Sequence, residues 1–315
     1  ENLEFTDLAL LEPLVNNGFL LPSSVDEYER YDYYKQILSN QLPTPKHYTV
    51  TLTSRCNARC TYCYEEGILK SDMSMETAQL FVQALLNSHE EINITWFGGE
   101  PLLKTDLISY ISNTLTDHKK AFKAGIITNG SLLTQELIET QFPIWNIEWV
   151  QITLDGMSEE YLKRKRYYDS NPRIFDTILE NIEHLLSNKI WVNIRLNIDS
   201  VNRDECIKVA RYMKDAFSDS SYLSVYPAFL YGTIDSLANE NERIACASDI
   251  YALFPPEAHL LSSIPKVHPC FITQRHAIVI DTDGSVLACD GDIGRQFTKY
   301  ADVHAITDFD NLEKP

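Results

Sequence analysis

The chain has 315 residues, of which 44% are hydrophobic and 23% are charged, and its net charge is −18. This is the composition of a globular protein with enough apolar material for a large core. So negative a charge disfavours nucleic acid and anionic membranes as partners, and no segment is apolar for long enough to predict a membrane helix.

The seven cysteines are an odd number, and three of them lie within eight positions, from Cys56 to Cys63. Disulfide frameworks use even numbers of cysteines in oxidising compartments, whereas a close group of this kind is typical of metal ligands. Because the start of the sequence carries no signal-peptide pattern, we expect a protein of the reducing cytoplasm.

Residues 1–44 predict short helices, which end at a linker around Pro43 and Pro45. The next part of the chain alternates between strand-like runs and helical patterns. Six strands are predicted, at residues 48–53, 92–97, 125–128, 147–154, 190–198 and 222–230. Five helices are predicted between them, at 104–117, at 173–187 and from about residues 74, 134 and 202 onwards, the last with a capping box of Asn202 and Glu205.

Strands that alternate with helices predict parallel βα units, so the expected fold class is α/β, with residues 45–230 as a partial (β/α)6 barrel of the TIM type. Residues 231–269 are predicted as a linking region with one helix. Residues 270–315 are predicted as a small β-hairpin module that turns at Asp283 and Gly284. In a parallel barrel the ligands lie at the carboxyl ends of the strands, so polar residues at those ends are the site candidates.

Cys56, Cys60 and Cys63 follow the first predicted strand directly, in the pattern CxxxCxxC. Three thiolates on one loop can hold three irons of a [4Fe–4S] cluster and leave the fourth iron open to another ligand. Structural zinc needs four ligands, and no fourth cysteine or histidine follows closely. The spacing therefore favours an iron–sulfur cluster with one open position.

This loop resembles the signature loop of radical S-adenosylmethionine (SAM) enzymes, and further stretches in the same order strengthen the resemblance. Gly98, Gly99 and Glu100 close the second predicted strand and are similar to the GGE motif of the family, which holds the amino group of SAM. Two glycines bring backbone carbonyls close to a ligand, and a carboxylate complements an ammonium. A plain Gly-Gly turn is the alternative to a SAM contact here.

Polar residues also close the third, fourth and fifth predicted strands. The resemblance implies that they line the ribose, adenine and carboxylate region of SAM, with Tyr62 packed near adenine. Arg195 suits a carboxylate through its fork of donors. Ordering of the barrel rim is the alternative role for each of them. The SAM-contacting residues expected in this way are Tyr62, Gly98, Gly99, Glu100, Thr128, Asn129, Asp155, Arg195 and Asn197.

A second pair, Cys270 and Cys289, resembles the auxiliary-cluster segment of radical SAM enzymes with a SPASM or twitch extension. The resemblance implies an auxiliary iron–sulfur cluster, but the later cysteines of a full SPASM module do not follow Cys289. Three explanations are open: the chain stops short of them, a smaller twitch-like cluster recruits Cys246 or a non-cysteine ligand, or the cluster is absent. Cys206 lies on an apolar helical stripe, which predicts a buried core residue.

The motifs from residue 46 to residue 290 resemble most the radical SAM maturases of ribosomally made peptides (RiPPs). The resemblance implies reductive cleavage of SAM to a 5′-deoxyadenosyl radical, which takes hydrogen from a precursor peptide so that a thioether or carbon–carbon cross-link forms. It also implies a leader-bearing precursor peptide and a low-potential electron donor, such as flavodoxin or ferredoxin, as partners. Residues 1–44 are then a remnant of a leader-binding domain or simple capping helices.

Three other functions remain open at this point. A sulfatase-maturating enzyme and a small-molecule radical SAM dehydrogenase would share the barrel motifs. A non-enzymatic iron–sulfur electron carrier would share the cysteines, but the barrel and the GGE stretch argue against it.

Overall fold

The computed structural model describes residues 46–89, 91–217, 220–230, 239–254 and 277–310, together with residues 26, 28, 29 and 312. The chain divides into two units, Glu1–Thr44 and Pro45–Pro315. Nearly all of the first unit, and with it the short helices expected there, lies outside the described residues, as does Cys270.

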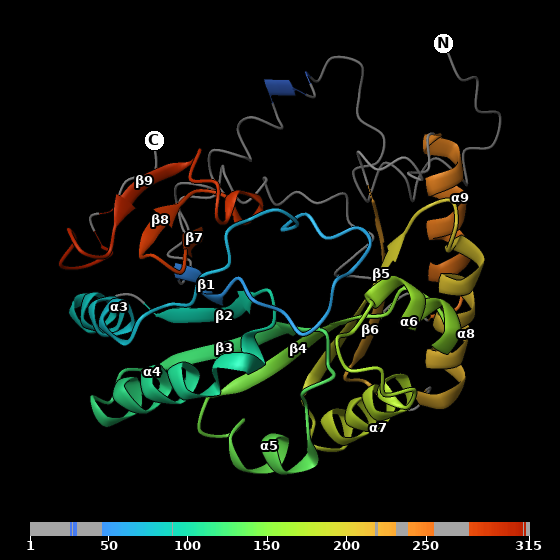
Figure 1. The fold of residues 1–315 in the computed structure, drawn as a ribbon, viewed down its shortest axis with the longest axis horizontal. Helices are drawn as coiled ribbons and strands as arrows, with labels where there is room; N and C mark the ends of the chain where they lie inside the picture. Colours follow the sequence, from blue (N-terminus) through green and yellow to red (C-terminus); the bar gives the residue numbers. More distant parts are fainter. Residues whose placement is uncertain are drawn as a thin grey trace. The chain divides into compact units, whose positions relative to one another are not determined.

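A sheet in the order β6-β5-β4-β3-β2-β1-β7-β8-β9 forms the centre of the second unit (Figure 1). Its first six strands follow one another in chain order, and each pairs in parallel with the next. The structure therefore confirms the α/β class and the succession of six parallel strands. These strands are β1 Lys46–Thr53, β2 Ile92–Gly98, β3 Phe122–Thr128, β4 Ile147–Thr153, β5 Trp191–Ile198 and β6 Leu223–Phe229.

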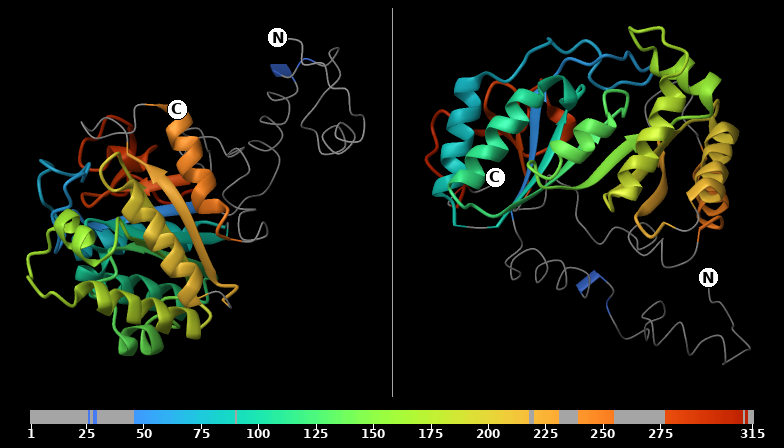
Figure 2. Two further views of the ribbon diagram at one scale, coloured as in Figure 1. Left: turned by 90° about the vertical axis from the view of Figure 1, so that its right-hand side faces the viewer. Right: turned by 90° about the horizontal axis from the view of Figure 1, so that it is seen from below.

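Helices connect these strands and lie along one face of the curved sheet (Figure 2). Each of the five helices predicted between the strands is present, although one further helix, α6, was not predicted. The helices are α3 Met75–Asn87, the 3-10 turn η1 Pro101–Lys104, α4 Thr105–Asp117, α5 Gln135–Thr140, α6 Ser158–Lys165, α7 Ile174–Ser187, α8 Arg203–Phe217 and α9 Glu240–Tyr251.

The two faces of the sheet differ because successive side chains of a strand point to opposite sides. One register row, consisting entirely of buried apolar side chains, packs in the hydrophobic core: Val50, Trp96, Ile126, Val150 and Val192. The neighbouring row faces the other way, and there Gly125 makes room for an aromatic ring. A Cβ atom on Gly125 would lie 1.9 Å from the ring of Trp149.

The C-terminal strands extend this sheet rather than forming one of their own. Strand β7 Ala277–Ile280 pairs in parallel with β1. Strands β8 Ser285–Leu287 and β9 Lys299–Asp302 then continue as an antiparallel ribbon. The expected hairpin is confirmed between β7 and β8, where Gly284 has the positive φ of +87° that a tight turn favours. None of the helices in the described parts of the chain is long and apolar enough to span a membrane.

The predicted capping box at the start of α8 is wrong. The side chain of Asn202 accepts a hydrogen bond from the amide of Asp199 and donates to the carbonyls of Asp155 and Asn197. Glu205 instead pairs with Lys208 on its own helix. Asn202 therefore ties the ends of β4 and β5 together, a long-range role that a local spacing rule does not detect.

Candidate active site

The cysteine loop, residues 54–71, begins where β1 ends and returns to the same place. The amide of Ser54 donates to the carbonyl of Ser71 at 2.9 Å, which closes the base of the loop. At its far side the loop docks on the last turn of α6. The amide of Arg59 donates to the carbonyl of Lys165 at 2.9 Å, and the amide of Thr61 donates to that of Arg164 at 3.0 Å. Backbone hydrogen bonds thus fix the loop between β1 and α6.

The three thiols of this loop differ in their surroundings. Cys63 is exposed, whereas Cys56 and Cys60 are half-buried. Burial, together with the nearby charges of Glu100 and the other two cysteines, raises the pKa of Cys56 to about 12. Its sulfur also accepts hydrogen bonds from the amide of Ala58 at 3.4 Å and from the side chain of Asn129 at 3.8 Å. Bound iron would instead favour the thiolate form of Cys56, because a coordinated thiol is deprotonated.

The donor set suits an iron–sulfur cluster better than a single ion. Among the residues that the structure describes, no three His, Cys, Asp or Glu side chains converge closely enough to hold one metal ion. A cubane cluster does not require the ligands to meet at one point, because each thiolate binds its own iron. The three cysteines lie on one loop within electrostatic range of one another, and N–H donors already reach the sulfur of Cys56. The residues therefore fit a [4Fe–4S] cluster.

Gly98 and Gly99 let the end of β2 pass against the start of the cysteine loop. A Cβ atom on Gly98 would lie 2.1 Å from the carbonyl oxygen of Thr53, and one on Gly99 would lie 2.3 Å from that of Arg55. Gly98 also has a φ of +128°, which side chains rarely allow. The predicted Gly-Gly pair thus has a packing reason that is independent of any ligand.

Glu100 is fully buried beside these glycines, and its carboxylate joins β2 to β3. It accepts hydrogen bonds from the hydroxyl of Thr128 at 2.7 Å, the amide of Asn129 at 2.8 Å and the amide of Leu102 at 3.1 Å. Burial nevertheless raises the pKa of Glu100 to about 7. Three predicted SAM residues, Glu100, Thr128 and Asn129, therefore meet in one hydrogen-bonded group.

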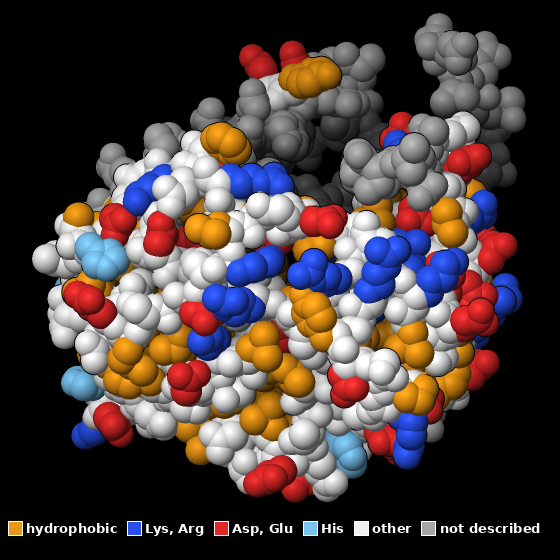
Figure 3. Space-filling model, viewed as in Figure 1, with side chains coloured by type: hydrophobic (Ala, Val, Ile, Leu, Met, Phe, Trp, Pro, Cys, Tyr) orange, Lys and Arg blue, Asp and Glu red, His pale blue; other side chains and the backbone are white. Residues whose placement is uncertain are grey.

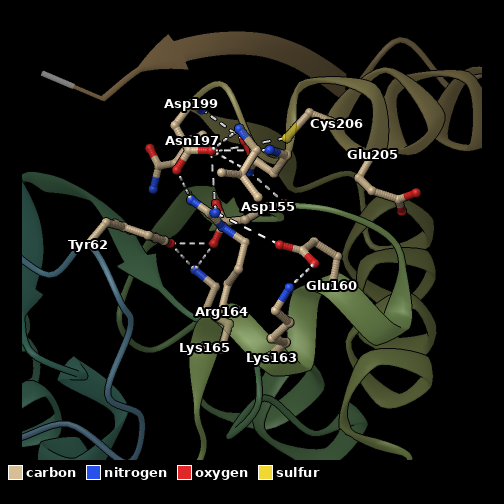
Figure 4. Close-up of polar contacts among 12 residues, drawn as sticks. Tyr62, Asp155, Glu160, Lys163, Arg164, Lys165, Asn197, Asp199, Glu205 and Cys206 are labelled. Atoms are coloured by element: carbon tan, nitrogen blue, oxygen red, sulfur yellow. Dashed lines mark hydrogen bonds and ion pairs between the residues drawn. The ribbon is translucent and has the colours of Figure 1, made fainter. Parts of the chain in front are cut away.

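A buried ionic group joins Tyr62 of the cysteine loop to the end of β4 (Figure 4). The ammonium of Lys165 lies 2.9 Å from the Oδ2 atom of Asp155 and 2.8 Å from the hydroxyl of Tyr62, which also donates to that Oδ2 atom. Burial alone would lower the pKa of Lys165, but the charge of Asp155 raises it instead. Burial also raises the pKa of Tyr62, so the phenol keeps its proton.

The other carboxylate oxygen of this group, Oδ1 of Asp155, is buried and has no hydrogen-bond partner among the described residues. A buried acceptor without a donor is costly, so this atom marks a place where a ligand hydroxyl or amine would be stabilised. It is the best local sign of a binding position at the end of β4.

A second buried ion pair lies next to the first (Figure 4). The guanidinium of Arg164 lies 2.6 Å from the Oδ2 atom of Asp199, which follows β5. Arg164 and Lys165 are adjacent residues at the end of α6, and both side chains are less than a tenth exposed. Sequence reasoning missed both residues because their helix has no apolar stripe. The signal that could have found them is the dense run of cations from Lys163 to Arg166, between the fourth and fifth strands.

Arg195 and Asn197 lie on β5 next to these groups, and Asn202 links the backbone of Asn197 to that of Asp155. The Nε atom of Arg195 donates to the Oδ1 atom of Asn197 at 2.9 Å, and Arg195 also bonds with Tyr226 of β6. The structure thus brings these two predicted residues together with each other. Their contacts lie on the face opposite the helices.

The C-terminal segment holds the cysteine loop from another side. The guanidinium of Arg295 donates to the carbonyl of Tyr64 at 2.8 Å, and the hydroxyls of Ser71 and Thr282 lie 2.7 Å apart. Gly294 packs so closely that a Cβ atom there would lie 2.3 Å from Ile68. The loop between β8 and β9 is therefore fitted to the cysteine loop.

The structure describes one of the two predicted auxiliary cysteines, Cys289. Cys289 lies two residues after the end of β8 and is half-buried, with its sulfur 3.8 Å from the Oδ1 atom of Asp290. Cys270 lies outside the described residues. Cys206 and Cys246 are both fully buried, the first on α8 as predicted and the second on α9, and each lies within electrostatic range of the other.

Similar proteins include several with named activities. GTP 3′,8-cyclase of Aliarcobacter butzleri is 28% identical over 174 residues, which cover 52% of this chain and 50% of that protein. The antilisterial bacteriocin subtilosin biosynthesis protein AlbA of Bacillus subtilis is 27% identical over 272 residues, covering 80% of this chain and 56% of AlbA. The chain spans about half the length of the curated relatives it matches.

Solved structures share the fold. The structure of anSMEcpe with bound AdoMet and a Cp18Cys peptide matches 84% of this chain and 79% of its own, with a TM-score of 0.67 at 18% identity. Streptococcus suis SuiB bound to the precursor peptide SuiA matches 95% of this chain and 74% of its own, with a TM-score of 0.53 at 14% identity.

The family model of the radical SAM superfamily matches residues 50–213, from β1 to α8. This stretch is more than half of the chain and contains the cysteine loop, the Gly-Gly-Glu turn and the buried ionic groups. The chain therefore belongs to the radical SAM superfamily, whose enzymes use a [4Fe–4S] cluster and SAM.

Proposed function

We propose that this radical SAM enzyme modifies a precursor peptide, with a [4Fe–4S] cluster bound by Cys56, Cys60 and Cys63. The observation that carries the proposal is the seating of a three-thiol loop at the carboxyl ends of the parallel strands. These ends are where parallel barrels bind their ligands. Backbone hydrogen bonds to α6 fix the loop, so the thiols are held before any metal arrives.

SAM is proposed to bind beside the open position of the cluster. The Gly98–Gly99 backbone and Glu100 would hold its amine, and Tyr62 and the orphan Oδ1 atom of Asp155 would hold its ribose and adenine. Thr128 and Asn129 act by holding Glu100 in place. Arg195, with Asn197 as its partner, is the proposed contact for the SAM carboxylate.

A bound cluster and SAM would supply the family's chemistry, the one-electron cleavage of SAM to methionine and a 5′-deoxyadenosyl radical able to take hydrogen from a substrate. The protein's own part would be to position these groups. Lys165 does this from α6 by joining Tyr62 of the loop to Asp155 at the end of β4, and Arg164 pairs with Asp199 after β5.

A peptide is the favoured substrate because three similar proteins concern peptides by name. AlbA takes part in bacteriocin biosynthesis, the SuiB structure contains the precursor peptide SuiA, and the anSMEcpe structure contains a Cp18Cys peptide. The GTP 3′,8-cyclase matches favour a second candidate, a small-molecule radical SAM reaction. An auxiliary cluster that uses Cys270 and Cys289, and a flavodoxin or ferredoxin as electron donor, belong to the proposal as well.

The ligand set is tested by reconstituting the protein with iron and sulfide without oxygen and assaying 5′-deoxyadenosine after dithionite reduction. Wild type should form 5′-deoxyadenosine, and Cys60→Ala should fall to background. Cys206→Ala is the matched control, because that cysteine is buried in the core and should leave the product intact. Equal product from wild type and Cys60→Ala would sink the proposed ligands.

The substrate class is tested separately by mass spectrometry. The reconstituted enzyme is incubated with peptides encoded beside its gene and, in parallel, with GTP. A peptide that loses two hydrogens for each cross-link supports the proposal. Conversion of GTP without any change in the peptides would contradict it and favour the second candidate.

A further inference from the structure

The cysteine loop has a surface charge opposite to that of the molecule as a whole. The chain has a net charge of −18, yet Lys and Arg side chains form a band across the face that carries this loop and α6 (Figures 1 and 3). We call this group the cationic band and define it by residues whose neighbourhood is established by contacts: Arg55, Arg59, Lys70, Lys104 and Arg166.

Two sets of contacts bring the cationic band together. At the base of the loop, Arg55 and Lys104 both reach the carboxylate of Asp72, at 3.4 and 3.0 Å. Lys70 lies beside them because Ser54 bonds to the carbonyls on both sides of it. At the other end, the amide of Arg59 donates to the carbonyl of Arg166 at 3.1 Å. The band therefore runs along the loop from β1 to α6.

The band is available to a partner. The side chain of Arg55 is 58% exposed, and Arg59, Lys70 and Arg166 are exposed as well. The guanidinium of Arg59 contacts the hydroxyl and ring of Tyr168, so its charge is not cancelled by that contact. The loop and its base also carry three carboxylates, the buried Glu65, the exposed Glu66 and the half-exposed Asp72, so the five cations of the band leave a local excess of two positive charges.

The position of the band relates it to electron delivery. Arg55 directly precedes Cys56, and Arg59 directly precedes Cys60. The family's reaction consumes one electron that must come from outside the enzyme, and electron transfer slows steeply with distance. A carrier must therefore dock over the cysteine loop. An acidic carrier is repelled by most of this molecule and attracted at the band, which sets its orientation as well as its place.

We propose that the cationic band is the docking surface for an acidic one-electron carrier protein of the flavodoxin type. The reduced carrier loses one electron to the enzyme and leaves oxidised by one electron, with no bond made or broken between the two proteins. This inference rests on the proposed cluster ligands, because they place the electron's destination beneath the band. An acidic precursor peptide is the rival occupant.

The test measures the affinity of the reconstituted enzyme for a purified bacterial flavodoxin by calorimetry. The double variant Arg59→Gln with Arg166→Gln removes two exposed cations of the band. Its affinity should fall about tenfold at low salt, and the difference from wild type should shrink when the ionic strength rises from about 50 to about 300 mM. Arg211→Gln with Lys214→Gln, two exposed cations of α8, is the matched control and should bind like wild type.

Two further readouts separate the possible failures. Dithionite-driven SAM cleavage and the electron paramagnetic resonance signal should be the same in the band variant and in wild type, which shows an intact cluster. A wild type without that signal would defeat the proposed ligands rather than the docking surface. Equal flavodoxin affinity in the band variant and wild type would overturn the docking surface. So would a loss of peptide binding with flavodoxin affinity retained, because the band would then serve the peptide.

Discussion

The cysteine loop is held from two sides that differ in kind. On the α6 side, buried charges meet: Lys165 with Asp155 and Arg164 with Asp199, all less than a tenth exposed. On the β8–β9 side, an exposed Arg295 reaches a backbone carbonyl, and the other contacts cited are the close packing of Gly294 and one hydroxyl pair with Thr282 of the β7–β8 turn. Removing one partner of a buried ion pair leaves an unpaired buried charge, so changes on the α6 side should destabilise the protein strongly. Removing a contact on the β8–β9 side should cost much less free energy.

The largest expected effect is on the charged side. Lys165→Met leaves the carboxylate of Asp155 buried without its cation, which should lower the free energy of unfolding by about 3–5 kcal/mol. Urea denaturation of the apoprotein measures this. Lys163→Met is the matched control on the same helix, since its side chain is 69% exposed and its ion pair should contribute less than about 1 kcal/mol. Similar losses in both variants would remove the distinction between the two sides.

An intermediate effect depends on pH and comes from Glu100. Burial raises its pKa from 4.5 to about 7 in the folded protein, so the folded state keeps a proton that the unfolded state has released. The contribution of Glu100 to stability is thus complete below pH 4.5 and is lost as the pH rises through 7. Over that range wild type should lose about 3 kcal/mol relative to Glu100→Gln. If the free energies of unfolding of the two proteins changed in the same way with pH, the raised pKa of Glu100 would be contradicted.

The smallest effect is expected on the β8–β9 side. Arg295→Ala removes one hydrogen bond to the carbonyl of Tyr64 and should cost about 0.5–1.5 kcal/mol. Hydrogen exchange gives the sharper readout. The amide of Ile68 should exchange faster, while those of Arg59 and Thr61, which bond to α6, should keep their wild-type rates. If all amides of the cysteine loop exchanged faster by the same factor, the α6 side and the β8–β9 side would not hold the loop independently.

Much of the fold could be predicted from the sequence because it rests on local patterns. Alternating strand and helix signals gave the six parallel strands, and Ser74 and Thr134 cap their helices through side-chain hydrogen bonds. The same reasoning missed α6, whose sequence Ser158–Lys165 is nearly all charged or polar. It also failed for Asn202, because a cap and a cross-strand tie use the same residue type.

The site was predictable only in its outline. Cysteine spacing and the Gly-Gly-Glu stretch identify the loop and the strand end beside it. The partners Lys165 and Arg164 are set by where α6 ends relative to the loop, and that depends on tertiary packing. Nor does the sequence separate a glycine kept for a ligand from one kept for the carbonyl of Thr53. The two roles of a glycine can be told apart only in the three-dimensional structure.

The parallel pairing of β1 with β7 has a consequence for how the protein is made. Strand β1 is among the first parts of the sheet to leave the ribosome, but the strand that covers its outer edge is encoded more than two hundred residues later. Until residues 277–280 emerge, that edge presents open backbone groups to other chains. The nascent barrel is therefore vulnerable to aggregation at this edge until β7 has emerged, and a chain without β7 would carry the same exposed edge permanently.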